Sequence, residues 1–214
     1  MEKRYALLRR RPDIKESEFR SKWLAAGRHF QGSGACLQNH LQGVDQRDPT
    51  WSGIGEFDPE AEVAWLANAD FADHAKSVLV TGSTFVVNDR PQTGVKYLTL
   101  TRRSPSFGRR EFAEYWRHSH VEMLRRLPEF WGRLGRYVQH LLEPDSARSL
   151  ADAPISFDYD GLAELWFDSE ASAAEAVADP STAAAIKQDD RHFLLLPYER
   201  YISEQVLIGP FRLP

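Results

Sequence analysis

The sequence predicts an α+β fold made of two similar halves. Short apolar runs bounded by Gly and Pro alternate with segments whose apolar residues have helical spacing. The order strand–helix–strand–strand–helix–strand occurs twice, and it is the order of a ferredoxin-like βαββαβ unit. Of the 214 residues 42% are hydrophobic and 12% aromatic, enough to form a core. We therefore expect two tandem ferredoxin-like repeats, at residues 1–93 and 94–214.

Each half contains a strand, a helix, two further strands, one or two helices and a closing strand. The strands are apolar runs that end at charged, Gly or Pro residues, and the helices begin at capping residues such as Ser17. The expected segments of the first half are 3–10, 17–27, 35–43, 53–58, 59–68, 71–79 and 85–87. Those of the second half are 95–103, 109–127, 136–144, 161–168, 169–178, 181–189 and 198–208.

Residue identities also recur between the halves. Three short segments match in the same order, at a spacing too long for a solenoid repeat, which favours a duplicated domain. The matched pairs are EFRSKW (18–23) with EFAEYW (111–116), LQNHL (37–41) with VQHLL (138–142), and GIGEFD (53–58) with GLAELWFD (161–168).

The helix expected at 109–127 carries a histidine on its apolar stripe. Phe112, Trp116, His120, Leu124 and Leu127 share one face, because residues three and four apart stack on a helix. A histidine among buried apolar groups needs a polar partner or a chemical role. It can be a packed core residue bonded to a backbone carbonyl, or an acid/base group.

Composition excludes several classes of protein. The formal net charge of −4 is unlike that of a nucleic-acid-binding domain. No run approaches the roughly 20 apolar residues of a membrane helix, and the N-terminus lacks a secretory signal. Cys36 is the single cysteine, so neither an internal disulfide nor a structural zinc site is expected. We expect a cytoplasmic protein with neither nucleic acid nor membrane as partner.

The second half resembles a known family. REFAEYWRHSHVEML, RYVQHL, YDGLAELWFDSEAS and DDRHFL are similar, in order and spacing, to the signatures of the EthD family of the dimeric α+β-barrel superfamily. The resemblance runs from Lys96 to Ile208. The residues that match the family pattern are Phe112, Tyr115, Trp116, His120, Asp160, Gly161, Glu164, Asp190 and Phe193.

The resemblance implies that two antiparallel sheets pair into an α+β barrel with the helices outside. Family members usually combine two chains, whereas here a duplication could supply both halves, and a homodimer stays possible. Apolar residues on both faces of the 136–144 strand agree with two covered faces. The first copy is degenerate, because Gly27 stands where the helix histidine is expected, although His29 lies close by.

The resemblance makes His120 the first candidate for a catalytic residue, since imidazole exchanges protons near neutral pH. Glu164 is the second, because it lies between Leu162 and Trp166 on one strand face. It could orient His120, act as a base, or be structural like the equivalent Glu56. The expected substrate-binding residues, which could instead be plain core, are Trp116, Tyr115, Tyr137, His140 and Trp166.

Strand parity groups His140 with Val138 and Leu142, against Tyr137, but does not say which set lines a pocket. No metal is expected, because His118 and His120 diverge on a helix. Cofactor motifs such as a phosphate-binding loop are absent from the sequence, so none is expected.

The predicted function is a cofactor-independent enzyme, a lyase/cyclase or monooxygenase, that acts by proton transfer. Its expected ligand is a hydrophobic aromatic or polyketide-like small molecule, which it would cyclise, dehydrate, decarboxylate or oxygenate. The alternatives are a haem-binding α+β-barrel protein and a non-catalytic small-molecule-binding accessory protein of a degradation or biosynthesis pathway. Because a fold does not fix a function, the site must decide among them.

Overall fold

The computed structural model describes residues 1–28, 36–44, 49–59, 61, 63–90 and 94–208. The chain forms two compact units. Unit 1 comprises Met1–Ser83, Glu143–Phe157 and Ser203–Pro214, and unit 2 comprises Thr84–Leu142 and Asp158–Ile202. The boundaries fall inside two long strands, so each of these strands contributes to both units.

Unit 2 has the α+β order predicted for the second half. Its sheet has the strand order β9–β5–β8–β6–β4, and β8 pairs antiparallel with both β5 and β6. Its elements are β5 (Val95–Thr101), α2 (Arg109–Glu114), the π-helical segment η2 (Tyr115–His120), α3 (Val121–Arg125), α4 (Pro128–Arg133), β6 (Leu134–Leu142), β8 (Gly161–Phe167), α5 (Glu170–Ala176), α6 (Pro180–Phe193) and the first residues of β9 (Glu199–Ile208). The predicted α+β class is confirmed.

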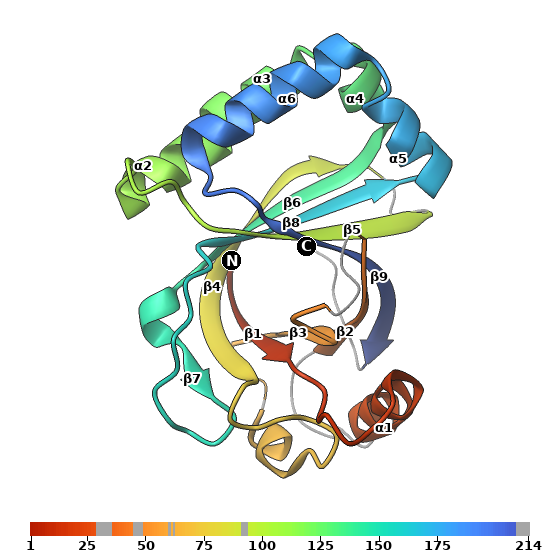
Figure 1. Ribbon diagram of the computed structural model, residues 1–214, viewed down its shortest axis with the longest axis vertical. Helices are drawn as coiled ribbons and strands as arrows, with labels where there is room; N and C mark the ends of the chain where they lie inside the picture. The colour runs from red at the N-terminus through yellow and green to blue at the C-terminus, as the bar shows by residue number, and fades with distance from the viewer. Residues whose placement is uncertain (29–35, 45–48, 60, 62, 91–93, 209–214) are drawn as a thin grey trace. The chain divides into compact units, whose positions relative to one another are not determined.

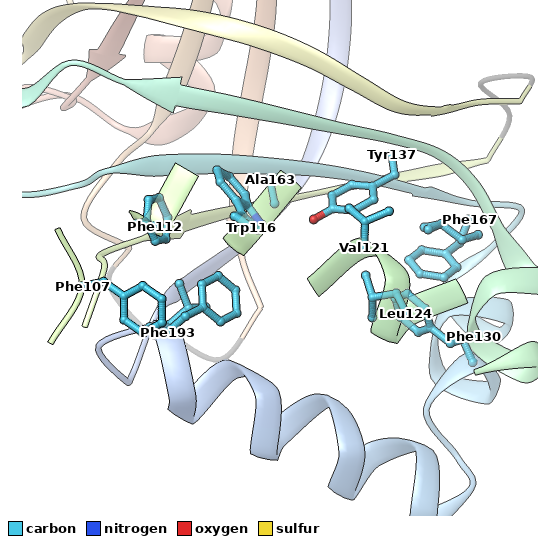
Figure 2. Close-up of a cluster of buried hydrophobic side chains, with 13 residues drawn as sticks. Phe107, Phe112, Trp116, Val121, Leu124, Phe130, Tyr137, Ala163, Phe167 and Phe193 are labelled. Carbon is cyan, nitrogen blue, oxygen red and sulfur yellow. The ribbon is translucent and has the colours of Figure 1, made fainter. Parts of the chain in front are cut away.

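The helices of unit 2 lie on one face of its sheet (Figure 1). Between them is an aromatic core that contains Phe112, Trp116, Tyr137 and Phe193, all at most 2% exposed (Figure 2). Burying such rings removes large apolar areas from water, which is the main force holding helices to a sheet. The predicted helical stripe is therefore the packing face of the helix.

Unit 1 has a sheet with the strand order β7–β4–β1–β3–β2–β9. Strand β1 pairs antiparallel with β3 and β4, and β2 pairs antiparallel with β3. Its elements are β1 (Glu2–Leu8), α1 (Glu16–Arg28), β2 (Cys36–Gly43), β3 (Gly53–Phe57), the 3-10 helix η1 (Ala64–Asn68), the first half of β4 (Val78–Asp89), a second 3-10 helix η3 (Pro144–Ser146), β7 (Arg148–Ser149) and the end of β9.

The helices predicted at 59–68 and 71–79 are wrong. Among the described residues of the first window only η1 is helical, and the second window is replaced by turns followed by the start of β4. Phe71 is 2% exposed without a helix, because backbone hydrogen bonds tie its turn to the segment after β1. The Arg11 amide donates to the Phe71 carbonyl (3.1 Å), and the Asp73 amide donates to the Arg9 carbonyl (2.8 Å). Tertiary contacts thus override a weak local helix preference.

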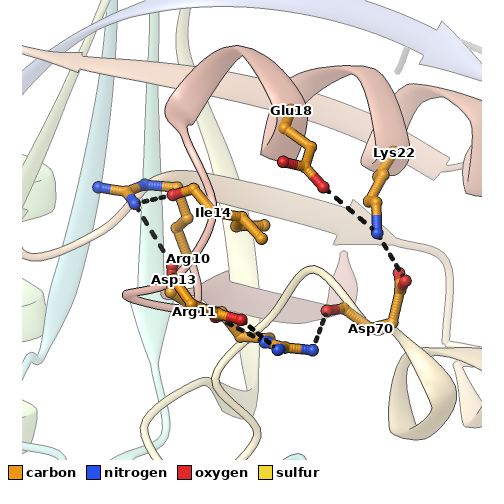
Figure 3. A network of polar contacts seen from close by, with 7 residues as sticks. All are labelled: Arg10, Arg11, Asp13, Ile14, Glu18, Lys22 and Asp70. Carbon is orange, nitrogen blue, oxygen red and sulfur yellow. Dashed lines mark hydrogen bonds and ion pairs between the residues drawn. The ribbon is translucent and has the colours of Figure 1, made fainter.

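A polar network fixes the start of α1 (Figure 3). Arg11 forms an ion pair with Asp13 and donates to the Asp70 carbonyl at 2.9 Å. The Asp70 carboxylate lies 2.7 Å from Nζ of Lys22 on α1. These pairs are solvent-exposed, so water screens them and each contributes little to the stability of the fold.

Within the described part of the chain, the helices are too short or too polar to cross a membrane.

Candidate functional site

The histidine-bearing helix of unit 2 changes its winding at the candidate site. Residues Tyr115–His120 form a π-helical segment between the α-helical segments α2 and α3. Such insertions are frequent at functional sites, because they shift the side chains that follow along the helix. Trp116 and His120 both remain buried, at 2% and 7% exposure.

His120 is held by a carboxylate from another helix. Its Nδ1 lies 2.7 Å from Oδ2 of Asp189 on α6, and its ring packs on Phe193 with centroids 5.1 Å apart. The hydroxyl of Tyr115 donates to the other oxygen of Asp189 at 2.6 Å. The largely buried Asp189 carboxylate thus forms one hydrogen bond with a ring nitrogen of His120 and one with the phenol hydroxyl of Tyr115.

The electrostatics of this triad keep Asp189 ionised. Burial raises the pKa of Asp189, but the hydrogen bonds from His120 and Tyr115 outweigh burial and bring the pKa below its usual value. Burial and the negative charge of Asp189 raise the pKa of Tyr115, so its hydroxyl stays protonated. An ionised Asp189 accepts a hydrogen bond from Nδ1–H, which assigns the proton of the neutral His120 ring to Nδ1 and leaves Nε2 as an acceptor.

Asp190, which matches the family pattern, lies next to this group. It is 7% exposed and accepts a hydrogen bond from the Tyr198 hydroxyl at 3.1 Å. Burial raises the pKa of Asp190. Donor atoms of His120, Asp189 and Asp190 lie within 4.8 Å of one another, so a divalent cation could use them. The hydrogen bonds of His120 and Asp189 account for their placement without one.

A surface hollow of about 580 Å³ adjoins the triad. Tyr115 belongs to both, because its ring lines the hollow while its hydroxyl is bonded to Asp189. Phe107 and His192 also line the hollow, and their rings pack edge-on at 5.2 Å. His120 itself does not line it. The hollow therefore offers an aromatic surface. Tyr115 connects this surface to the Asp189 carboxylate that binds His120.

The sheet face beneath the helices carries part of the predicted site. Tyr137 is 1% exposed, and its hydroxyl accepts a hydrogen bond from Nε2 of Gln139, which also donates to the Trp116 carbonyl (both 2.9 Å). Trp116 covers Gly161, where a Cβ atom would lie 2.6 Å from the indole. The structure thus brings Tyr115, Trp116, His120 and Tyr137 to the helix side of the sheet.

Glu164 is on the opposite face of the sheet. Its carboxylate lies 2.7 Å from Nζ of Lys96 and 2.6 Å from Nε1 of Trp166. His140 is nearby, with Nε2 3.8 Å from Glu164 and Nδ1 3.1 Å from the Thr84 hydroxyl. Burial opposes ionisation of Glu164, but the charge of Lys96 and the contact with His140 lower its pKa. This cluster is a buried, charged polar network.

The expectation that Glu164 orients His120 is therefore wrong, because Asp189 does so. His140 and Trp166 do not form one wall with Trp116 and Tyr137. The physical reason is strand alternation: Glu164 and Trp166 point away from Ala163, which packs in the helix-side core. Their catalytic and binding roles stay predictions.

Unit 1 repeats several of these contacts. Lys3 pairs with Glu56 at 3.3 Å, as Lys96 pairs with Glu164. Gln38 Nε2 donates to the Trp23 carbonyl at 2.9 Å, and Trp23 covers Gly53, where a Cβ atom would lie 2.1 Å from the ring. These equivalences support the proposal that residues 1–93 and 94–214 are copies. His29 lies outside the described residues.

Sequence reasoning missed Asp189, Lys96 and Thr84. Asp189 precedes Phe193 by four residues, so both lie on one face of α6, and a carboxylate one turn from a buried ring is a usable signal. Lys96 alternates with apolar residues on β5, but its burial could not be told from the strand pattern. Thr84 carries no signal in sequence.

Comparisons with known proteins agree with this architecture. Residues 104–196 match the EthD domain family. No curated protein matches the sequence. An anthrone oxidase-like protein is similar in structure, with a TM-score of 0.57 and 13% identity over 98% of this chain and 93% of that one. A candidate monooxygenase of Fusobacterium nucleatum gives 0.56 and 10%, over 99% and 95% of the two chains. A candidate monooxygenase of Lactobacillus acidophilus gives 0.50 and 10%, over 97% and 94%.

Proposed function

Because residues 104–196 of this chain form an EthD domain, we propose that the protein is a cofactor-independent enzyme that transfers a proton on a hydrophobic aromatic molecule. His120 is the general base. The observation that carries the proposal is the 2.7 Å contact between His120 Nδ1 and Asp189, with Tyr115 on the second carboxylate oxygen. A histidine bonded in this way is oriented and kept in one tautomer.

The chemistry follows from the assignment of the proton to Nδ1. Nε2 of the neutral ring accepts a proton from an acidic carbon of the substrate, and the ring becomes an imidazolium. The negative charge of Asp189 stabilises this cation, and the Tyr115 hydroxyl keeps the carboxylate in place. Transfer of the proton to a departing hydroxide gives water and completes a dehydration, and its transfer to a carbon or oxygen atom of the new ring completes a cyclisation. In a decarboxylation the imidazolium protonates the carbanion left by loss of carbon dioxide, and in an oxygenation the carbanion reacts with dioxygen, which is the oxidant.

The substrate class follows from the surroundings of Tyr115. Phe107 and His192 line the same hollow as Tyr115, which favours a flat aromatic ligand by stacking. One structural neighbour bears the name anthrone oxidase-like. An anthrone is an aromatic ketone with acidic hydrogens between two rings, so anthrones are the first substrates to test.

The test is turnover of an anthrone panel by the wild type and by His120→Gln. We expect His120→Gln to lower kcat by about 10²- to 10⁴-fold, the usual contribution of a positioned base. His74→Gln is the matched control, because it removes a histidine bonded to the Ala69 carbonyl at 2.8 Å in unit 1. Unchanged kcat in His120→Gln contradicts the proposal, and saturable binding without any product would indicate a carrier instead.

A further inference from the structure

Unit 1 contains a cavity of its own, of about 430 Å³. Its floor is apolar and is formed by Val63, Ala67, Leu79 and Leu150. Val63 and Ala67 come from η1 and the residue before it, Leu79 from β4, and Leu150 from the segment that follows β7. Three of them, Val63, Leu79 and Leu150, also belong to the core packed around Phe19 and Trp23 of α1. The cavity thus opens on the helix-side face of the unit 1 sheet.

The described residues of unit 1 contain no second long helix beside this cavity. In unit 2, the 14-residue helix α6 packs on this side of the sheet. In unit 1, the corresponding segment provides only η1, five residues long. A short 3-10 helix cannot cover the apolar residues of β4, so Leu79 stays half-buried. Apolar surface beside a hollow of this volume is typical of small-molecule sites, which span roughly 300–1,000 Å³.

Two arginines add positive charge to the rim. Arg4 on β1 is half-buried, and its Nη1 donates only a long bond of 3.4 Å to the Ala61 carbonyl. Arg148 on β7 is exposed. No carboxylate among the described residues forms an ion pair with either guanidinium, and Asp152 is the one acidic side chain in the lining. Counted over the described lining residues, two guanidinium groups and one carboxylate give the rim a net positive charge.

We propose that this cavity binds an apolar small molecule that carries one carboxylate group. The apolar part lies against Leu79 and Leu150, and the carboxylate contacts Arg4 and Arg148, whose planar guanidinium groups suit a carboxylate. The site is separate from the His120 triad, since all its residues belong to unit 1. It does not depend on the proposed proton transfer.

The experiment compares three probes of equal chain length by titration calorimetry: decanoate, decanol and decyltrimethylammonium. We expect decanoate to bind at least about tenfold more tightly than decanol, because charge-assisted hydrogen bonds add more than 1 kcal/mol. Decyltrimethylammonium is expected to bind most weakly. Equal affinity of decanoate and decanol overturns the proposal, as does the absence of decanoate binding at millimolar concentration.

Single-residue variants test whether the probe binds in this cavity. Arg4→Gln and Arg148→Gln should each weaken decanoate binding about tenfold and leave decanol unchanged. Ala67→Trp fills the hollow from an exposed position and should abolish binding of both probes. Arg126→Gln, at the exposed residue that follows α3, and Ala171→Trp, at an exposed position of α5, are the matched controls in unit 2 and should bind as the wild type does. If the single variants Arg4→Gln and Ala67→Trp both bind decanoate with wild-type affinity, the assignment of the probe to this cavity is overturned. Circular dichroism verifies the fold of each variant.

Discussion

His120 and Asp189 are joined by a hydrogen bond of 2.7 Å between Nδ1 and Oδ2, across 69 positions of sequence. The bond connects the π-helical segment η2 to α6 within unit 2. Because both side chains are only 9% exposed, water screens the interaction poorly. The hydrogen bond between His120 and Asp189 thus links two helices, and it also orients the imidazole in a way that is suited to proton transfer.

Replacing Asp189 by Asn should impair turnover while leaving His120 in place. An amide can donate to Nδ1 and so favour the wrong tautomer, and it has no charge to stabilise the imidazolium. We expect kcat to fall by at least about 10²-fold. Tyr198→Phe, which removes the 3.1 Å bond to the neighbouring Asp190, is the control and should retain most of the activity. Full activity of Asp189→Asn would show that the carboxylate is merely structural.

The buried pair Lys96–Glu164 should be more important to stability than to turnover. Glu164→Gln leaves the Lys96 ammonium, whose side chain is 0% exposed, without its carboxylate. We expect the free energy of unfolding to fall by about 3–5 kcal/mol, measured by urea denaturation. The double variant Lys96→Met/Glu164→Gln should recover part of this loss, because neither charge of this pair remains. Equal losses in the single and double variants would argue against the charge explanation.

Gly161 should tolerate no side chain, because Trp116 covers it. A Cβ atom there would lie 2.6 Å from the indole and 2.8 Å from the Thr101 hydroxyl. We expect Gly161→Ala to lower the melting temperature and to cost roughly 1–3 kcal/mol, as overpacking does. Gly132→Ala is the control: it lies in α4 with open space around it and should stabilise the helix by about 0.5–1 kcal/mol. Opposite signs for the two variants are the predicted result.

His40 should make unit 1 sensitive to acid. Burial, helped by the charge of Arg20, lowers the pKa of His40 to about 4 from its usual 6.5. Between these values the unfolded chain binds more protons than the folded one, so stability is complete above pH 6.5 and falls as the pH drops. We expect wild type to lose roughly 2 kcal/mol more than His40→Gln between pH 7 and pH 5, measured by urea unfolding. Parallel pH profiles of the two proteins would contradict this origin.

The sequence predicted the helix stripe and the strands of unit 2 because their apolar periodicity is strong. Phe112, Trp116 and His120 are buried as their spacing requires. The segment at 71–79 was mispredicted, because Phe71 is buried by turns whose hydrogen bonds come from distant backbone. The spacing of apolar residues carries no information on such tertiary hydrogen bonds.

Part of the candidate functional site can be predicted from the sequence. His120 could be found because a polar residue interrupts an apolar stripe. For its partner Asp189 the sequence offers only the position one turn before Phe193, and the contact with His120 does not follow from it, because the two helices meet only in three dimensions. Strand parity placed Glu164 and Trp166 on one face but left open which face meets the helices. Only the packing of Tyr137 and Ala163 into the helix-side core decides it.

The most direct test of proton transfer by His120 is hydrogen–deuterium exchange at the acidic carbon of an anthrone in heavy water, followed by NMR. Exchange reports the proton step alone, whatever reaction follows. The proposal predicts that the wild type and His74→Gln accelerate exchange over buffer, and that His120→Gln does so at least about 10²-fold less. Equal acceleration by wild type and His120→Gln would contradict the role given to this imidazole.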